Sequence, residues 1–170
     1  MSAVFEAGID PHVAARQSRH LQGTIAVAKL ERLVEALQRD VGSADVDVKF
    51  ELGDNGRIEF ELAINAEVIA QCQRCLGDVQ FAVSSRRRMA VVTEQSAVDD
   101  LPEELEPVMV LGNTLKLIPV IEDELILSLP IVIKHDVCQP AVELAPEDDL
   151  DSARENPFAV LKQLKAKDTS

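Results

Sequence analysis

The chain has 170 residues, of which 46% are hydrophobic, enough for one globular domain with its own core. Its formal net charge of -13 disfavours broad contact with phosphate backbones or anionic membranes and favours contact with basic proteins. The most apolar run, Leu125 to Ile133, is interrupted by Ser128 and Pro130 and is far shorter than the roughly 20 residues of a membrane-spanning helix. Three cysteines and an N-terminus without an export-signal pattern predict a cytoplasmic protein that has no disulfide framework.

The first elements predicted along the chain are two helices with a short strand between them. Asp10 can cap a helix that runs from Pro11 to about Arg19. A brief strand follows over residues 21–27. Apolar residues at helical spacing then predict a second helix over 29–41, ended by Gly42.

Alternation of apolar and polar residues predicts three antiparallel strands in the middle of the chain. Their ranges are 44–53, 57–71 and 79–92. Turn residues at 53–56 join the first two strands as a hairpin. Ser85 and Arg87 fall on the apolar side of the third strand, so a bulge or a strand end is expected near the basic run 86–88, at a margin of the sheet.

The C-terminal half is predicted to hold an acidic loop over 93–107, a short strand over 108–110 and a helix over 116–128. The fold class that follows is α+β, with an antiparallel sheet covered on one face by helices. We predict a single domain over 1–139. A mobile acidic tail follows it, made of a linker over 140–155 and a short basic amphipathic helix over 156–170.

Cys72 and Cys75 lie three positions apart in the connection between two predicted antiparallel strands, and Gly77 follows closely. A C-x-x-C turn followed by glycine brings two thiolates to one point, as in half of a tetrahedral zinc site. His135 and Cys138 repeat this spacing farther along the chain. The four residues are therefore a candidate structural zinc site.

Two other interpretations of the cysteines remain open. A thiol–disulfide enzyme carries its C-x-x-C at the start of a helix, where the helix dipole lowers the pKa of the first thiol, and that context is missing here. The cysteines can also be free thiols that pack as small hydrophobic side chains without a metal.

Arg86, Arg87 and Arg88 form the one dense basic run, with Arg74 as a further cation beside the cysteines. Each guanidinium can donate two hydrogen bonds to a phosphate, so these four are candidate RNA-binding residues. The chain has no Trp or Tyr, however, and so lacks most of the stacking platform that single-strand binders combine with positive charge.

No catalytic constellation is apparent in the sequence. The histidines at 12, 20 and 135 are scattered, and no glycine-rich phosphate loop follows a predicted strand. We therefore expect neither an enzyme nor a small-molecule substrate.

Four stretches together resemble one known family, the YceD-like large ribosomal RNA subunit accumulation proteins in their proteobacterial form. They are Cys72-Gln73-Arg74-Cys75-Leu76, LPEELEP at 101–107, IEDELILSLP at 121–130 and NPFAVL at 156–161. The block E-D-E-x-x-L-x-L-P downstream of C-x-R-C is far more specific than either piece alone.

The resemblance implies a non-enzymatic role in the synthesis, processing or stability of 23S rRNA, with that RNA or a pre-50S particle as partner. The alternative is an acidic adaptor or chaperone for a basic ribosomal protein, because family genes commonly lie beside one for a small large-subunit protein. Glu122, Asp123 and Glu124 would then form a protein-docking face, unless they are only the solvated side of a helix. Other branches resemble a zinc ribbon with a second C-x-x-C, where this chain keeps only Cys138.

Overall fold

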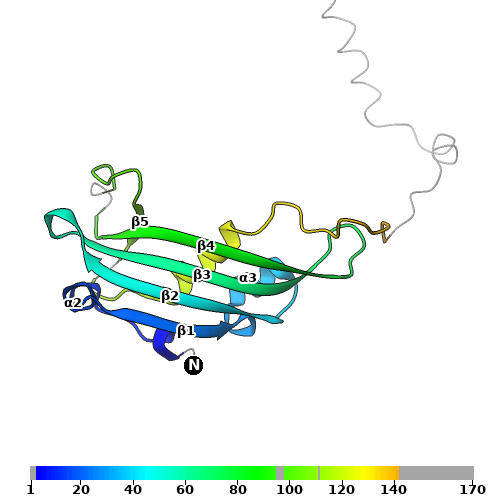
Figure 1. The fold of residues 1–170 in the computed structure, drawn as a ribbon, viewed down its shortest axis with the longest axis horizontal. Helices are drawn as coiled ribbons and strands as arrows, with labels where there is room; N and C mark the ends of the chain where they lie inside the picture. Colours follow the sequence, from blue (N-terminus) through cyan, green and yellow to red (C-terminus); the bar gives the residue numbers. More distant parts are fainter. Residues whose placement is uncertain (1–2, 95–97, 111, 142–170) are drawn as a thin grey trace, which may run out of the picture. The chain divides into compact units, whose positions relative to one another are not determined.

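The computed structural model describes residues 3–94, 98–110 and 112–141. Residues up to Cys138 form one compact unit built on a five-stranded sheet, with helices against one face (Figure 1). The predicted C-terminal helix over 156–170, and nearly all of the predicted linker before it, lie outside the described residues.

The strands are β1 (His20–Ala26), β2 (Gly42–Leu52), β3 (Ile58–Gln71), β4 (Asp78–Val92) and β5 (Glu106–Met109). The α-helices are α1 (Ala3–Glu6), α2 (Pro11–Arg16), α3 (Glu31–Leu37) and α4 (Leu117–Leu127), with short 3-10 helices at Val27–Lys29 and Asp54–Gly56. The Asp10 carboxylate accepts hydrogen bonds from the backbone N–H groups of His12 and Val13, which confirms it as the cap of α2.

The strands lie in the order β1-β2-β3-β4-β5, and the first four are antiparallel neighbours. The alternation predicted this pairing for β2, β3 and β4, and the structure adds β1 beside β2. The expectation of a purely antiparallel sheet is wrong at one edge, because β5 pairs with β4 in parallel. Parallel neighbours need a long crossover, and the connection from Val92 to Glu106 is long enough to return the chain to the same end of the sheet.

The core lies between the sheet and the helices α3 and α4. Alternate residues of β2 and β3 are buried on this side, including Phe50 and Phe60, whose ring centroids lie 5.3 Å apart. Leu37 and Ile121 supply part of the helical layer. The period-two pattern thus puts one face of each strand in the core and leaves polar side chains on the other.

The second helix is shorter than predicted. Helix α3 ends at Leu37, where Gln38 takes the left-handed conformation (φ 56°), and Val41 is exposed. Gly42 does not end the helix but begins β2, with a φ of 135° and so little room that an added Cβ would lie 2.4 Å from the Glu67 carbonyl oxygen. The glycine is therefore needed for the strand rather than for a helix end.

Strand β4 is also more regular than predicted. Its pairing with β3 runs without interruption from Asp78 to Ala90, so the expected bulge or strand end near the arginines is wrong. The three arginines lie well inside the strand. None of the helices in the described ranges is long and apolar enough to cross a membrane.

Candidate metal centre and charged surfaces

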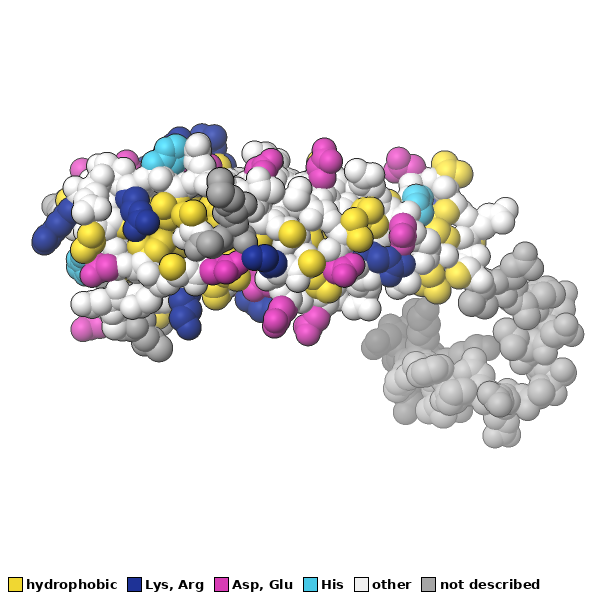
Figure 2. Space-filling model, turned by 90° about the horizontal axis from the view of Figure 1, so that it is seen from below, with side chains coloured by type: hydrophobic (Ala, Val, Ile, Leu, Met, Phe, Trp, Pro, Cys, Tyr) yellow, Lys and Arg dark blue, Asp and Glu magenta, His cyan; other side chains and the backbone are white. Residues whose placement is uncertain are grey.

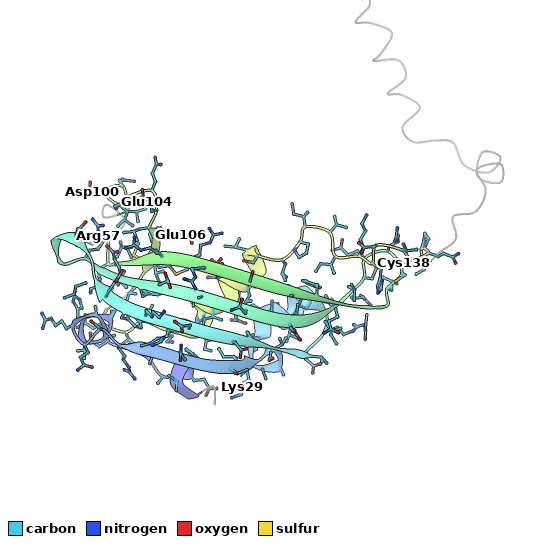
Figure 3. All side chains as sticks on the ribbon, viewed as in Figure 1. Lys29, Arg57, Asp100, Glu104, Glu106 and Cys138 are labelled. Carbon is cyan, nitrogen blue, oxygen red and sulfur yellow. The ribbon has the colours of Figure 1, made fainter. Side chains whose placement is uncertain are left out.

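The structure brings both halves of the predicted metal site together. Cys72 directly follows β3 and Cys75 lies in the turn to β4, whereas His135 and Cys138 belong to the segment after α4. The candidate ligand atoms of these four residues all lie within 4.8 Å of one another. Figure 3 places Cys138 at the end of the sheet where β3 turns into β4.

Backbone hydrogen bonds shape this corner. The Cys72 N–H donates to the Gly77 carbonyl (2.8 Å), and the Leu76 N–H donates to the Cys72 carbonyl (2.9 Å), which closes the turn around the thiols. The Gln73 N–H donates to the Ile133 carbonyl at 2.8 Å and so ties the distant segment to the turn.

The imidazole of His135 is oriented by its backbone contact. Its Nε2 lies 2.9 Å from the Asp78 carbonyl oxygen and donates to it, which leaves Nδ1 directed at Cys75 Sγ, 3.4 Å away. The side chains of Cys72 and Cys138, with the Asp78 carbonyl, raise the pKa of His135. A hydrogen bond on the far nitrogen is the usual way in which a metal-binding histidine is held.

The thiols differ in acidity. Cys72 is fully buried, yet a hydrogen bond from the Cys75 backbone outweighs burial and, with those of Arg74 and His135, lowers the pKa of Cys72 to about 5. The Gly77 backbone lowers the pKa of Cys75, but burial and the neighbouring thiols of Cys72 and Cys138 raise it further, so the net shift is upward. A thiolate at Cys72 is therefore stabilised before any cation arrives.

Arg74 belongs to this cluster rather than to the arginine run. Its Nε donates to Cys138 Sγ at 2.9 Å, and its Nη2 donates to the carbonyl oxygens of His135 (3.0 Å) and Asp136 (3.4 Å). The guanidinium offsets the negative charge of the thiolates. The sequence analysis did not predict that Arg74 supports the cysteine cluster. The one sequence signal for it is the position of Arg74 between the two cysteines.

The donor set fits a soft divalent cation. Three thiols and one imidazole are a common tetrahedral zinc set, and Cys72 and Cys138 already have their sulfur atoms 3.8 Å apart. Because four protein ligands fill a tetrahedron, a metal held here could cross-link two chain segments but would have no open position for a substrate.

The arginine run is divided between the two faces of the sheet. Arg87 is on the helix-covered side, where its Nε lies 3.2 Å from the Glu124 carboxylate and 3.4 Å from that of Glu106. Arg86 and Arg88 are on the opposite side. Arg86 pairs with Glu61 at 3.5 Å. Arg88 pairs with Glu59 at 2.9 Å and with Glu51 at 3.4 Å.

The expected single positive cluster is therefore wrong, because a strand sends neighbouring side chains to opposite faces. Arg74, at the far end of β3, is not part of it either. The contribution of the four arginines to RNA binding stays a prediction.

The acids of α4 do not form one solvated face. Glu122 is 6% exposed and accepts a hydrogen bond from the Arg32 backbone N–H at 2.9 Å. Glu124 is 3% exposed and faces Ser85 and Arg87 on β4. The expectation of exposure holds for Asp123 alone, which forms an ion pair with Arg32 at 2.6 Å.

Two surface features lie at the β5 edge, of which the sequence predicted the acidic loop but not the groove. Exposed acids lie in and after the loop before β5, and Figure 3 shows Asp100, Glu104 and Glu106 at the same end of the sheet as Arg57. A groove of about 590 Å³ runs between β5 and α4. Its walls come from separate elements, so no local sequence pattern marks it.

The fold and site describe an α+β protein of mixed surface charge with a corner suited to a structural metal. The family "Large ribosomal RNA subunit accumulation protein YceD" matches residues 60–165, a range that contains most of β3, all of β4, β5 and α4, and all four candidate ligands. A Haemophilus influenzae protein of the same name is 30% identical over 167 residues, which cover 94% of this chain and 95% of the relative. The chain therefore belongs to the YceD family, as the resemblance indicated. No solved structure matches it.

Proposed function

We propose that this protein supports the accumulation of large-subunit ribosomal RNA without catalysing a reaction, by holding a basic ribosomal protein against its acidic surface. The observation that carries the proposal is the pairing of Arg86, Arg87 and Arg88 with carboxylates. A phosphate would have to compete with these carboxylates for the guanidinium groups. The net charge of -13 adds a general repulsion of RNA and an attraction for basic partners.

The arrangement of surface charge supports a protein partner. Figure 2 shows acidic and basic side chains interspersed along the face that it presents. Glu103, Glu104 and Glu106 are all exposed near β5, where they line one hollow together with Arg86, Arg87 and Arg88. Complementary charge speeds the encounter with a basic protein and helps to select it.

Direct RNA contact is the second candidate function, and the exposure of Arg86 favours it. This side chain is 70% exposed and its ion pair with Glu61 is long, at 3.5 Å. A pair of this kind contributes little and can be exchanged for a phosphate contact. Phosphate contacts of this type would position RNA rather than read its sequence.

Affinity capture of assembling large subunits, with the full chain as bait, tests the two candidates. If the proposal holds, an identified basic large-subunit protein stays bound after RNase treatment. The charge-reversed variant Glu103→Lys/Glu104→Lys weakens its capture, and Arg86→Glu/Arg88→Glu serves as the matched control. RNA contact predicts the opposite result. In that case RNase treatment should release every ribosomal protein from the bait. The arginine variant should also make the affinity for 23S rRNA depend less on salt concentration.

We also propose that Cys72, Cys75, His135 and Cys138 hold a structural zinc ion. The support is their mutual distance, the backbone N–H groups directed at Cys72 and the fixed Nε2 of His135. The ion would fasten the segment after α4 to the β3–β4 turn. The cytoplasm, where ribosomal subunits assemble, would keep the three thiols reduced.

Metal analysis of the purified full chain tests this proposal. We expect about one zinc per chain, as for a closed four-ligand site, and loss of the metal in Cys72→Ser. Asp136→Asn, a change between two of the ligands, should keep it. A wild-type protein purified without a metal that also takes up none from a zinc-buffered solution would overturn the proposal.

A further inference from the structure

We propose that the groove between β5 and α4 is the docking site for an amphipathic helix of the basic partner, one that carries apolar side chains on one face and Lys or Arg around them. The inference rests on the proposed function, because it names where the partner binds. It concerns a surface apart from the metal cluster, and two of its lining acids, Glu106 and Glu124, pair with Arg87 of the arginine run.

The two walls of the groove come from the sheet edge and from one face of the helix. Glu106 and Val108 of β5, which pair with Met89 and Val91 on the helix-covered face, line one side, and Pro107 and Met109 border it at the sheet edge. Pro119, Asp123 and Leu127 of α4 line the other, at spacings of four residues that put them on the same helical face. The volume of about 590 Å³ is within the range of sites that accept several side chains.

The apolar walls are open to solvent. Leu127 is 79% exposed, Pro119 is exposed as well, and Val108 and Val120 are half-buried. Exposed apolar side chains gathered in one groove are typical of an interaction surface, whereas singly scattered ones are not. Removing these apolar side chains from water favours the binding of a partner that covers them.

The edge of β5 favours a helix over an added strand. The Val110 N–H donates to the Val92 carbonyl, so the backbone groups of Val110, and those of every second residue before it, face β4. The backbone groups of Pro107 and Met109 therefore face outward, away from β4, and proline has no N–H with which to pair an added strand. No other strand in the described part of the chain pairs with this edge. A strand added here would lose part of its ladder, so side-chain contacts must carry the binding.

The charge around the groove identifies the chemistry of its occupant. Glu106 and Asp123 line it and form exposed ion pairs with Arg87 (3.4 Å) and Arg32 (2.6 Å), which a basic partner can exchange. The exposed loop acids Glu103 and Glu104 lie in a neighbouring pocket beside the arginine run. Lys116 is the basic side chain among the lining residues. An apolar floor does not suit phosphates, whereas a helix with leucine-like residues inside and Lys or Arg outside matches both the floor and the rim.

The test uses a fluorescent synthetic helix made of Leu and Lys in amphipathic order, and a scrambled peptide of the same composition. Binding is measured by anisotropy with the full chain. We expect the ordered peptide to bind at least about tenfold more tightly than the scrambled one, a difference of about 1.4 kcal/mol. Leu127→Lys should lose that preference, because it places a positive charge on the apolar wall.

Ile131→Lys is the matched control, because Ile131 is 97% exposed and does not line the groove. It should leave the affinity unchanged, and circular dichroism should show both variants folded. If Leu127→Lys binds the ordered peptide as well as wild type does, the inference is overturned. A wild-type dimer that dissociates in Leu127→Lys, or displacement of the peptide by 23S rRNA, also overturns it by assigning the groove to another occupant.

The same variants separate this inference from the proposed function. If Leu127→Lys still captures the basic ribosomal protein after RNase treatment, the groove is the wrong site although the function stands. If wild type captures no ribosomal protein, the function itself fails.

Discussion

The carboxylate of Glu124 on α4 lies 3.2 Å from Nε of Arg87 on β4, and the same carboxylate accepts a hydrogen bond from the Ser85 hydroxyl. Glu124 is buried and Arg87 is about half exposed. The contact ties the helix to the fourth strand. It also explains why two polar residues occupy the covered side of β4 without a bulge.

Glu124→Gln should lower the free energy of unfolding by about 1–2 kcal/mol, because the amide keeps the shape of the side chain but weakens its charge-assisted hydrogen bonds. Urea denaturation at neutral pH measures the change. Asp123→Asn is the control and should cost less than about 0.5 kcal/mol, since its pair with Arg32 is exposed. Equal losses in the two variants would contradict the account of the buried contact.

Gly53→Ala should destabilise the protein by about 1–3 kcal/mol through crowding, as overpacking generally does. A Cβ at this position would lie 1.9 Å from Oε1 of Glu59, whose carboxylate is buried beside Arg57 and Arg88. The φ of Gly53 is -78°, so backbone strain is not the cause.

Thermal and urea unfolding of Gly53→Ala, Glu59→Ala and the double variant give a complete cycle. Removing the carboxylate makes room for the methyl group, so the two losses should be less than additive. Strict additivity would show that the steric explanation is wrong.

Arg74→Gln should weaken zinc binding by roughly tenfold, the lower end of the effect of residues that support metal ligands. The substitution removes the donor to Cys138 Sγ and the support of the His135 carbonyl. Competition with a chromophoric chelator measures the affinity. Arg86→Gln, on the same sheet but away from the cluster, should bind zinc as wild type does, and a similar loss in both variants would count against a local effect.

Asp47 should give the protein a small pH-dependent stability. Burial raises the pKa of Asp47, but hydrogen bonds from the side chains of Gln22 and His20, helped by the charges of His20 and Lys49, bring it below its ordinary 3.8. The Asp47 carboxylate therefore binds a proton more tightly in the unfolded chain than in the folded protein. The stabilisation is present above pH 3.8 and is lost as the pH falls through the lower folded-state value.

Asp47→Asn should accordingly unfold more easily than wild type at about pH 6, by less than about 1 kcal/mol because the pair with His20 is partly exposed. At about pH 2 the two proteins should differ much less. Urea unfolding at both pH values measures the difference. A constant difference would show that the carboxylate charge is not responsible.

Much of the fold follows from local pattern. The alternation that ends at Gln71 and resumes near Asp78 predicted two paired strands and a turn that holds Cys72 and Cys75. The apolar stripe of α4 was equally readable. The parallel placement of β5 was not, because the pairing of a four-residue strand depends on the path of the connection that precedes it.

The site was predicted as a set of residues and not as a geometry. Spacing alone selected Cys72, Cys75, His135 and Cys138, and the structure places their ligand atoms within 4.8 Å of one another. The predictions of one basic surface patch at the arginine run and one acidic surface patch on α4 were both wrong, and for the same reason. Glu124 and Arg87 turned out to face each other across a packed layer, and a sequence does not show which element covers which.

The sequence by itself determined what depends on neighbours along the chain: strand and helix periods, the hairpin turn at 53–56, and each C-x-x-C or H-x-x-C spacing. Only the tertiary structure decided which distant segments meet, and thus that Arg74 serves the cysteine cluster and that Glu122 and Glu124 are buried. The physical reason is that burial and pairing of a charge are set by the element packed against it. That element can lie anywhere in the sequence.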